Sequence, residues 1–180
     1  MHKVQNQKGH LETLPGPAGD RHDLHPVCPG ADHPHGPGKD RPVRLRPPLR
    51  RTKDLRHILW LDGEIFADDD PVDVWDPNVL WWAAGDLAFC GVRPLSCGTS
   101  AFLLRAGVVE EARGRGLQRR MIQTRLRWAK TQERIQTVIT YTIPENPWSS
   151  NNLIRCGFRL YEPQERWAGE AVNYFQKKIR

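Results

Sequence analysis

The 180-residue sequence contains no run of about 18 apolar residues, the length that a helix needs to cross a membrane. The stretch that begins at Met1 also lacks the apolar core of a secretory signal. We therefore expect a protein that stays in the cytoplasm and does not bind a membrane. A chain of this length suffices for one domain with a proper core, but not for two.

Closely spaced cysteines are missing as well. Four cysteines are scattered along the chain, and no two form a C-x-x-C pair: Cys28, Cys90, Cys97 and Cys156. A structural zinc site usually needs such pairs, and a disulfide framework is typical of smaller secreted proteins. The sequence therefore favours free, mostly buried thiols and no metal site.

The composition changes near residue 40. Residues 1–40 hold six of the seven histidines, together with many prolines and glycines. Such a stretch has too little apolar surface to offset the entropy lost on ordering, and its histidine spacing matches no closed tetrahedral metal site. We therefore expect a disordered tail over residues 1–40 and one folded domain over residues 41–180.

The folded part alternates between strand and helix patterns. Period-2 and β-branched runs predict strands at residues 43–46, 79–83, 87–92, 101–109, 137–142, 158–161 and 171–179. Apolar residues at three- and four-residue steps predict helices at residues 53–67 (with Thr52 as N-cap), 116–132 and 149–156. This order predicts a mixed α/β domain whose central parallel pair is formed by the two strands that flank the longest helix.

The most informative segment leads from a strand end into the longest expected helix: Arg113-Gly114-Arg115-Gly116-Leu117-Gln118. Backbone N–H groups in the first turn of a helix have no partner within the helix, and the helix dipole adds partial positive charge there. Two glycines let phosphate oxygens approach the backbone, and two arginines add formal charge. The segment therefore predicts a site for a phosphate-bearing ligand.

An arginine- and glycine-rich surface turn would have the same composition. Two better-known phosphate loops do not fit the segment: no Lys-Ser/Thr follows it, as a Walker loop requires, and Arg119 stands where a dinucleotide fingerprint has its third glycine.

The segment resembles the acetyl-CoA signature Q/R-x-x-G-x-G/A of the GNAT superfamily of N-acetyltransferases in five of its six places. Gln118 stands where the family usually has Gly or Ala. A second block resembles the later N-x-x-[A/S] and Gly-Phe motif of the family: it begins at Asn146-Pro147-Trp148-Ser149 and ends at Gly157-Phe158. Both blocks occur in the family's order, and the resemblance covers roughly residues 42–180.

The resemblance implies a GNAT-like mixed sheet of about six to seven strands, flanked by about three to four helices, with splayed central parallel strands. It also implies acetyl-CoA as co-substrate. The main chain of Val108 and Val109 would pair with the pantetheine arm, and residues 113–118 would hold the pyrophosphate. Asn146 and Asn152 would lie near the thioester or the pantetheine, where an amide both donates and accepts hydrogen bonds.

Acetyl transfer needs a neutral amine, a donor for the oxyanion of the tetrahedral intermediate, and a proton for the departing thiolate. The backbone N–H of Val108 is the candidate oxyanion donor. Glu110, the adjacent Glu111, and Glu145 are candidate bases, although each could equally be a solvated surface carboxylate.

The candidate proton donor is less clear. In the resemblance, Leu153 occupies the place where many family members have a tyrosine that acts as general acid. Tyr141, Tyr161, a water molecule or a low thiol pKa would have to serve instead.

The acceptor is expected to be a primary amine, of a small molecule or a protein, that approaches the first helix and residues 68–82. Five aspartates there could attract a cationic amine or simply form an exposed loop: Asp68, Asp69, Asp70, Asp73 and Asp76.

Two alternatives to an enzyme remain. A non-catalytic acyl-CoA-binding or protein-interaction module would explain the departures at Gln118 and Leu153. A net charge of +6 also suits a nucleic-acid-binding protein, but no helix-turn-helix or aromatic RNA-binding pattern supports one. We expect a monomer or a homodimer that binds no nucleic acid.

Overall fold

The computed structural model describes residues 47–180. Its strands are β1 (Arg50–Thr52), β2 (Leu80–Ala83), β3 (Ala88–Pro94), β4 (Ser100–Val108), β5 (Thr137–Thr142), β6 (Arg159–Leu160) and β7 (Asn173–Lys178). Its helices are α1 (Leu55–Ile65), the short 3-10 helix η1 (Glu110–Ala112), α2 (Leu117–Thr131) and α3 (Pro147–Arg155).

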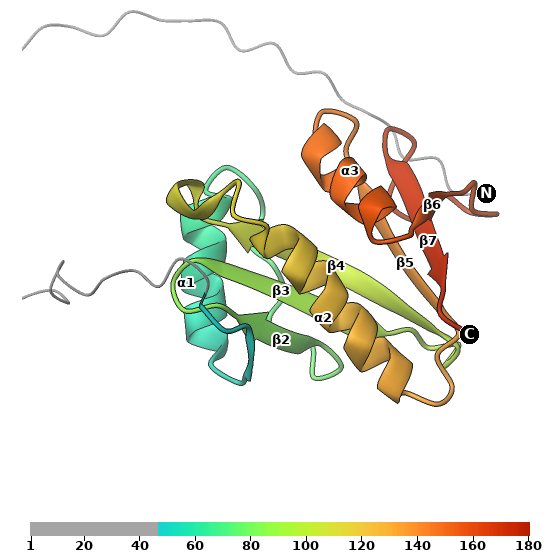
Figure 1. The fold of residues 1–180 in the computed structure, drawn as a ribbon, viewed down its shortest axis with the longest axis horizontal. Helices are drawn as coiled ribbons and strands as arrows, with labels where there is room; N and C mark the ends of the chain where they lie inside the picture. The colour runs from blue at the N-terminus through green and yellow to red at the C-terminus, as the bar shows by residue number, and fades with distance from the viewer. Residues whose placement is uncertain (1–46) are drawn as a thin grey trace, which may run out of the picture. The chain divides into compact units, whose positions relative to one another are not determined.

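The strands form one mixed sheet in the order β1-β2-β3-β4-β5-β7-β6. Neighbouring strands are antiparallel except β4 and β5, which are parallel because α2 connects them (Figure 1). The mixed α/β fold class and the parallel pair around the longest helix are thus confirmed.

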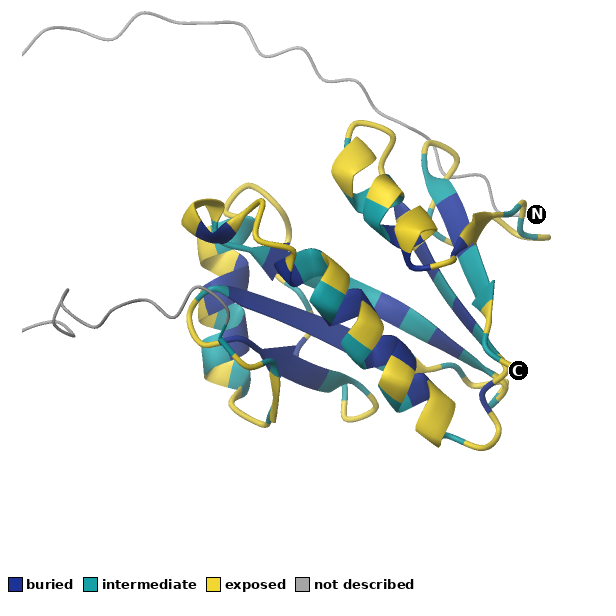
Figure 2. Cartoon of the chain, viewed as in Figure 1, coloured by how far each residue is buried: buried dark blue, intermediate teal, exposed yellow. Residues whose placement is uncertain are grey.

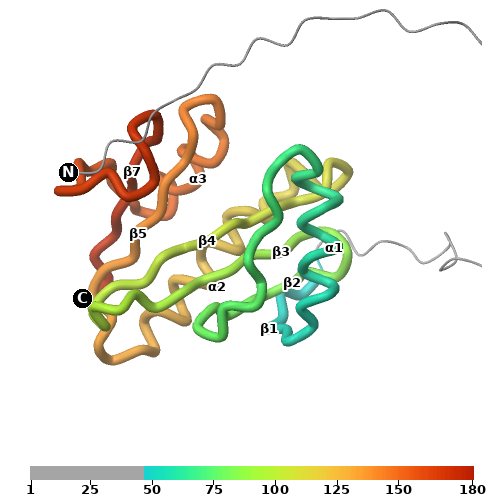
Figure 3. Tube along the Cα trace, turned by 180° about the vertical axis from the view of Figure 1, so that it is seen from behind, coloured from blue at the N-terminus to red at the C-terminus, as the bar shows by residue number. Residues whose placement is uncertain are grey.

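Helices cover both faces of the sheet. One face carries α2 and α3, whose inward side chains join a core with Leu103 and Val138 of the central strands (Figures 1 and 2). The other face carries α1 (Figure 3). This helix packs with Trp81 of β2 and Phe89 of β3. The chain can pack α1 closely against β4 because Gly107 has no side chain: a Cβ there would lie 2.8 Å from Phe66 Cε2.

Several boundaries differ from the sequence prediction. Asp54, not Thr52, caps α1: its side chain accepts from the His57 N–H, while the Thr52 hydroxyl accepts from the Asp54 N–H. Strand β1 follows Pro47-Pro48, where no strand was expected. The strand expected at 43–46 and the tail expected at 1–40 lie outside the described residues.

Three of the four cysteines fall in the described region, and all three are free thiols: Cys90 and Cys156 are buried, whereas Cys97 is exposed. Burial raises the pKa of the Cys90 thiol to about 11. Between residues 47 and 180, no helix is long and apolar enough to cross a membrane.

Candidate functional site

The two central strands β4 and β5 stay paired only at their beginnings. Their parallel ladder covers three residue pairs, from Ser100–Thr137 to Phe102–Ile139, after which the strands diverge. Beyond that point the carbonyl of Leu103 accepts a hydrogen bond from the Thr140 hydroxyl at 3.0 Å. Figure 3 shows the strands separating toward the ends that lead into α2 and α3.

A bulge in β4 accompanies the divergence. Cys90 faces Ala106 and Val92 faces Leu103, so Gly91 alone stands opposite both Leu104 and Arg105. The extra residue disrupts the ladder and leaves backbone carbonyls in need of another partner.

Arg125 of α2 supplies that partner. Its Nη1 donates to the carbonyls of Gly91 (3.1 Å) and Leu104 (3.0 Å), and its Nε donates to Met121 O. The side chain is buried among apolar residues, and this burial lowers the pKa of its guanidinium. Arg125 therefore fixes the shape of the bulge from the α2 side at the cost of burying a charge.

A cavity of about 360 Å³ opens where the strands separate. Residues from both faces of the sheet line it. Strand alternation and the helix contacts assign them: Thr140, Thr142, Gln118, Ile122, Arg125, Leu153, Asn146 and Ser149 lie on the side of α2 and α3, and Phe66, Val72, Phe102, Arg105, Tyr141 and Ile143 lie on the side of α1. The cavity thus passes through the sheet and connects its two faces.

The side that faces α2 and α3, here called the helix side, has a polar rim. Gln118 bridges the two helices: its Nε2 donates to the Ser149 hydroxyl at 2.6 Å, and its Oε1 accepts from Asn152 Nδ2 at 2.8 Å. Asn146 caps α3 by accepting from the Ser149 N–H. The structure therefore brings Gln118, Asn146 and Asn152, predicted from separate motifs, into one cluster.

The start of α2 lies beside this rim. Gly114 and Gly116 both have left-handed backbone conformations, with φ of 73° and 76°, which glycine adopts without strain. Asp54 and Asn146 cap α1 and α3, but within residues 47–180 no side chain caps α2, whose N-cap is Gly116. Its first N–H groups are therefore free to bind an anion, and the exposed Arg113 and Arg115 add positive charge.

The end of β4 exposes backbone groups to the same opening. Val109 N donates to Leu87 O of the neighbouring chain segment at 3.0 Å. Since backbone groups alternate along a strand, the N–H and C=O of Val108 face away from β3, toward the opening. Arg113 Nε indeed reaches Val108 O at 3.4 Å. The cavity itself is lined by Leu103 to Ala106 rather than by Val108.

The candidate bases lie farther out. Glu110 and Glu111 are exposed in η1, Glu145 is exposed in the turn before α3, and none of them lines the cavity. Leu153 does line the cavity. Tyr141 lines it too and is the tyrosine among the described lining residues.

On the side that faces α1, here called the α1 side, an ion pair between a buried aspartate and a partly buried arginine organises the cavity wall. Asp62 of α1 lies 2.7 Å from Arg105 Nε, though without the alignment of a hydrogen bond, and its other oxygen accepts from Val72 N. Arg105 also binds Asp69 and the Asp70 carbonyl and stacks on the Phe66 ring at 4.3 Å. The pair therefore ties the segment after α1 to β4.

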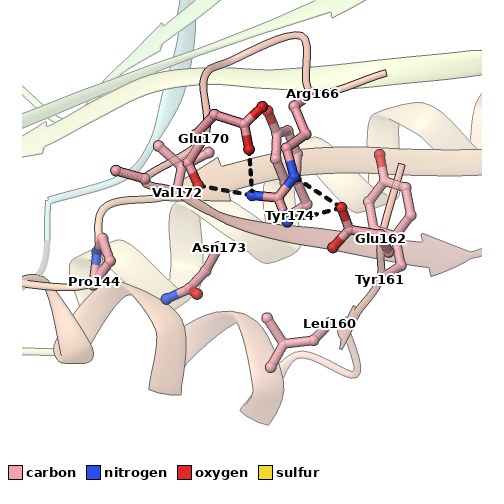
Figure 4. Close-up of a pocket in the computed structure, with 10 residues that line it drawn as sticks. Pro144, Leu160, Tyr161, Glu162, Arg166, Glu170, Val172, Asn173 and Tyr174 are labelled. Carbon is pink, nitrogen blue, oxygen red and sulfur yellow. Dashed lines mark hydrogen bonds and ion pairs between the residues drawn. The ribbon is translucent and has the colours of Figure 1, made fainter. Parts of the chain in front are cut away.

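A second cavity, of about 500 Å³, lies beside β7 (Figure 4). Its charged groups are paired with each other: Arg166 binds Glu162 at 2.9 Å and Glu170 at 3.2 Å. It adjoins no uncapped helix start, so the cavity between β4 and β5 is the better candidate site.

Sequence reasoning missed the two buried charges, although a sign of each was present. Arg125 falls four residues after Met121, and Asp62 four residues after Ile58, so each charge sits within the apolar stripe of its helix. A charged residue at such a place needs a specific partner inside the protein.

Comparisons of sequence find no relative: no family model and no curated protein matches the chain. Comparisons of structure find solved proteins of similar fold. The GNAT domain of S. lividans PAT matches with a TM-score of 0.58 at 11% identity, over 73% of this chain and 89% of that one.

Two further solved structures are similar. Arabidopsis thaliana NAA60 in complex with acetyl-CoA matches with a TM-score of 0.58 at 17% identity, over 73% of this chain and 98% of that one. Mutant forms of the spermidine/spermine N-acetyltransferase SpeG from Vibrio cholerae match with a TM-score of 0.56 at 16% identity, over 73% and 92%. The chain therefore has the fold of the GNAT acetyltransferases.

Proposed function

We propose that this protein is an N-acetyltransferase, which moves an acetyl group from acetyl-CoA to a primary amine. One observation carries the proposal: a cavity passes through the sheet between the diverging strands β4 and β5, and the uncapped start of α2 lies beside its polar rim. Two substrates could thus meet inside the sheet from opposite faces. Holding both reactants in this way supplies much of the acceleration of a two-substrate reaction.

The donor would enter from the helix side. The backbone of residues 113–118 would hold the pyrophosphate, with positive charge from Arg113 and Arg115. The pantetheine arm would pair with the main chain of Val108 and Val109, and Asn146 and Asn152 would hydrogen-bond to it.

The acceptor would enter from the α1 side and give up one proton before it attacks. Its nitrogen lone pair forms the new N–C bond at the thioester carbonyl, and the C–S bond then breaks with its electron pair going to sulfur. The second proton leaves the nitrogen, and the thiolate takes up one proton.

Groups in and around the cavity would assist each step. The backbone N–H of Val108 is the proposed oxyanion donor. Glu110 or Glu145 would accept the amine's proton through water, since both carboxylates are exposed. Tyr141 is the proposed source of the thiolate's proton, because Leu153 has none to give.

Thiol release from acetyl-CoA, measured across a panel of primary amines, tests the reaction. Amine-dependent release is expected, with an acetylated amine as the second product. If acetyl-CoA binds in calorimetry but no amine releases thiol, the non-catalytic binding module becomes the better account. Leu153, which stands where many GNAT proteins have a tyrosine, would favour that account.

Two glycine variants test the donor site. Gly116→Ala places a methyl group at a left-handed position with no atom within 4 Å, so it adds only backbone strain of about 1–2 kcal/mol. Gly98→Ala, with φ of 71° at the opposite end of β4, is the matched control. We expect weaker acetyl-CoA binding in Gly116→Ala alone; equal affinity in both variants would argue against the loop as the donor site.

A further inference from the structure

The α1 side of the cavity is apolar and aromatic. Phe66, Val72, Phe102, Tyr141 and Ile143 form its wall, and among residues 47–180 no aspartate or glutamate lines the cavity. Of the described lining residues, the charged one on this side is a cation, Arg105. Since its donors already bind Asp62, Asp69 and the Asp70 carbonyl, Arg105 is not free to bind a carboxylate of a substrate.

Three aspartates of the acidic run beyond α1 have partners within the protein. Asp69 pairs with Arg105, and Asp76 pairs with Arg93 at 3.2 Å. Asp73 accepts from the Trp75 N–H. These three carboxylates therefore stabilise the segment that they belong to.

Aromatic rings extend the wall outward from the cavity. Phe102 and Tyr141 stack at 6.1 Å, and the Trp167 ring packs edge-on against them at 5.2 Å and 5.5 Å. Trp167 belongs to the loop between β6 and β7, which the ion pairs of Arg166 with Glu162 and Glu170 hold together (Figure 4). Tyr141 and Trp167 remain 41% and 43% exposed, so their rings are open to a ligand.

We infer that the acceptor is a monoamine with an apolar, ring-bearing body, and not a polyamine. The inference rests on the proposed function and names the substrate class of that site. A ring gains by stacking on Phe102, Tyr141 and Trp167. A second ammonium of a polyamine would lose its hydration beside Arg105 with no carboxylate on the wall to replace it. The reacting nitrogen avoids this cost because it must be neutral to attack.

The direct test compares two amines on the full chain with saturating acetyl-CoA. Thiol release is measured with 2-phenylethylamine and with spermidine. We expect kcat/KM to favour 2-phenylethylamine by at least about tenfold, the scale on which an apolar pocket discriminates. Equal or better turnover of spermidine overturns the inference while the proposed transferase stands. Thiol release with neither amine, nor with any other amine of the panel, overturns both.

Tryptophan variants test the wall. Trp167→Ala is expected to raise KM for 2-phenylethylamine about tenfold while KM for acetyl-CoA stays unchanged. Trp60→Ala serves as the control, because it removes another half-exposed tryptophan, which lies on α1 and stacks on His57. In this control we expect no change in KM for 2-phenylethylamine or in KM for acetyl-CoA. An unchanged KM for 2-phenylethylamine in Trp167→Ala contradicts the aromatic site.

A substitution that adds a carboxylate to the cavity wall tests why this wall would exclude polyamines. Ile143→Asp adds a carboxylate at a half-exposed position on the wall, and Ile154→Asp adds one at an equally exposed position on α3. Only Ile143→Asp is expected to lower KM for spermidine, by several-fold. An identical effect of both variants would show that general surface charge, not the wall, controls the choice of amine.

Discussion

The two sides of the cavity between β4 and β5 differ in chemistry. The helix side carries amides, hydroxyls and an uncapped helix start, held together by Gln118, Ser149 and Asn152. The α1 side carries aromatic and aliphatic side chains, held in place by the ion pair of Asp62 and Arg105.

The difference teaches how one opening in a sheet can serve two unlike ligands. A phosphate-bearing ligand needs N–H groups and positive charge, which the start of a helix provides. A ligand that must shed its charge before it reacts needs a surface with little water, which aromatic rings provide. If this division is correct, a substitution on one side should leave the properties of the other side unchanged.

The largest expected effect comes from breaking the ion pair on the α1 side. Asp62→Ala leaves the Arg105 Nε and the Val72 N–H without their partner. We therefore expect the free energy of unfolding to fall by about 3 kcal/mol. Urea denaturation measures the change. Replacing both charges, with Asp62→Leu and Arg105→Met together, should restore much of the stability; a single variant as stable as the parent would show that the pair does not organise this wall.

Gly116→Glu should give the next largest effect, on the helix side. A carboxylate at the start of α2 repels a diphosphate, and the left-handed backbone disfavours any side chain there. We expect acetyl-CoA affinity to fall about thirtyfold, or roughly 2 kcal/mol, in calorimetry. The denaturation midpoint should stay near that of Gly98→Glu, the control, and undiminished affinity would contradict the assignment.

Gln118→Ala should give the smallest effect. It removes two hydrogen bonds between α2 and α3 on a half-exposed rim, each of which contributes about 1 kcal/mol or less. We expect the Kd of acetyl-CoA to change by several-fold and KM of the amine to stay the same. A change in KM of the amine, without a change in the Kd of acetyl-CoA, would show that the two sides of the cavity are not independent.

The fold could be predicted from the sequence where local patterns are strong. The strand Thr137–Thr142 was placed at its observed bounds, and α2 within one residue at each end, because β-branched runs and an apolar helix stripe are local properties. The mixed sheet and its central parallel pair followed from the order of elements, whereas the opening between the parallel strands was implied only by the resemblance to the GNAT superfamily.

What could not be predicted depends on distant partners. Arg125 is stable in the core only because a bulge in β3–β4 pairing, more than twenty residues away in the chain, offers it carbonyls. The three-residue strand β1 has no pattern of its own and forms by pairing with β2. Nor could the sequence show that Arg93 pairs with Asp76 and Arg105 with Asp69.

A crystal structure of the protein with bound coenzyme A tests the central claim most directly. The account predicts diphosphate oxygens within about 3.2 Å of backbone N–H groups in residues 114–118, and the pantetheine between β4 and β5. Coenzyme A bound elsewhere, or an arm that does not enter the opening between these strands, would contradict it.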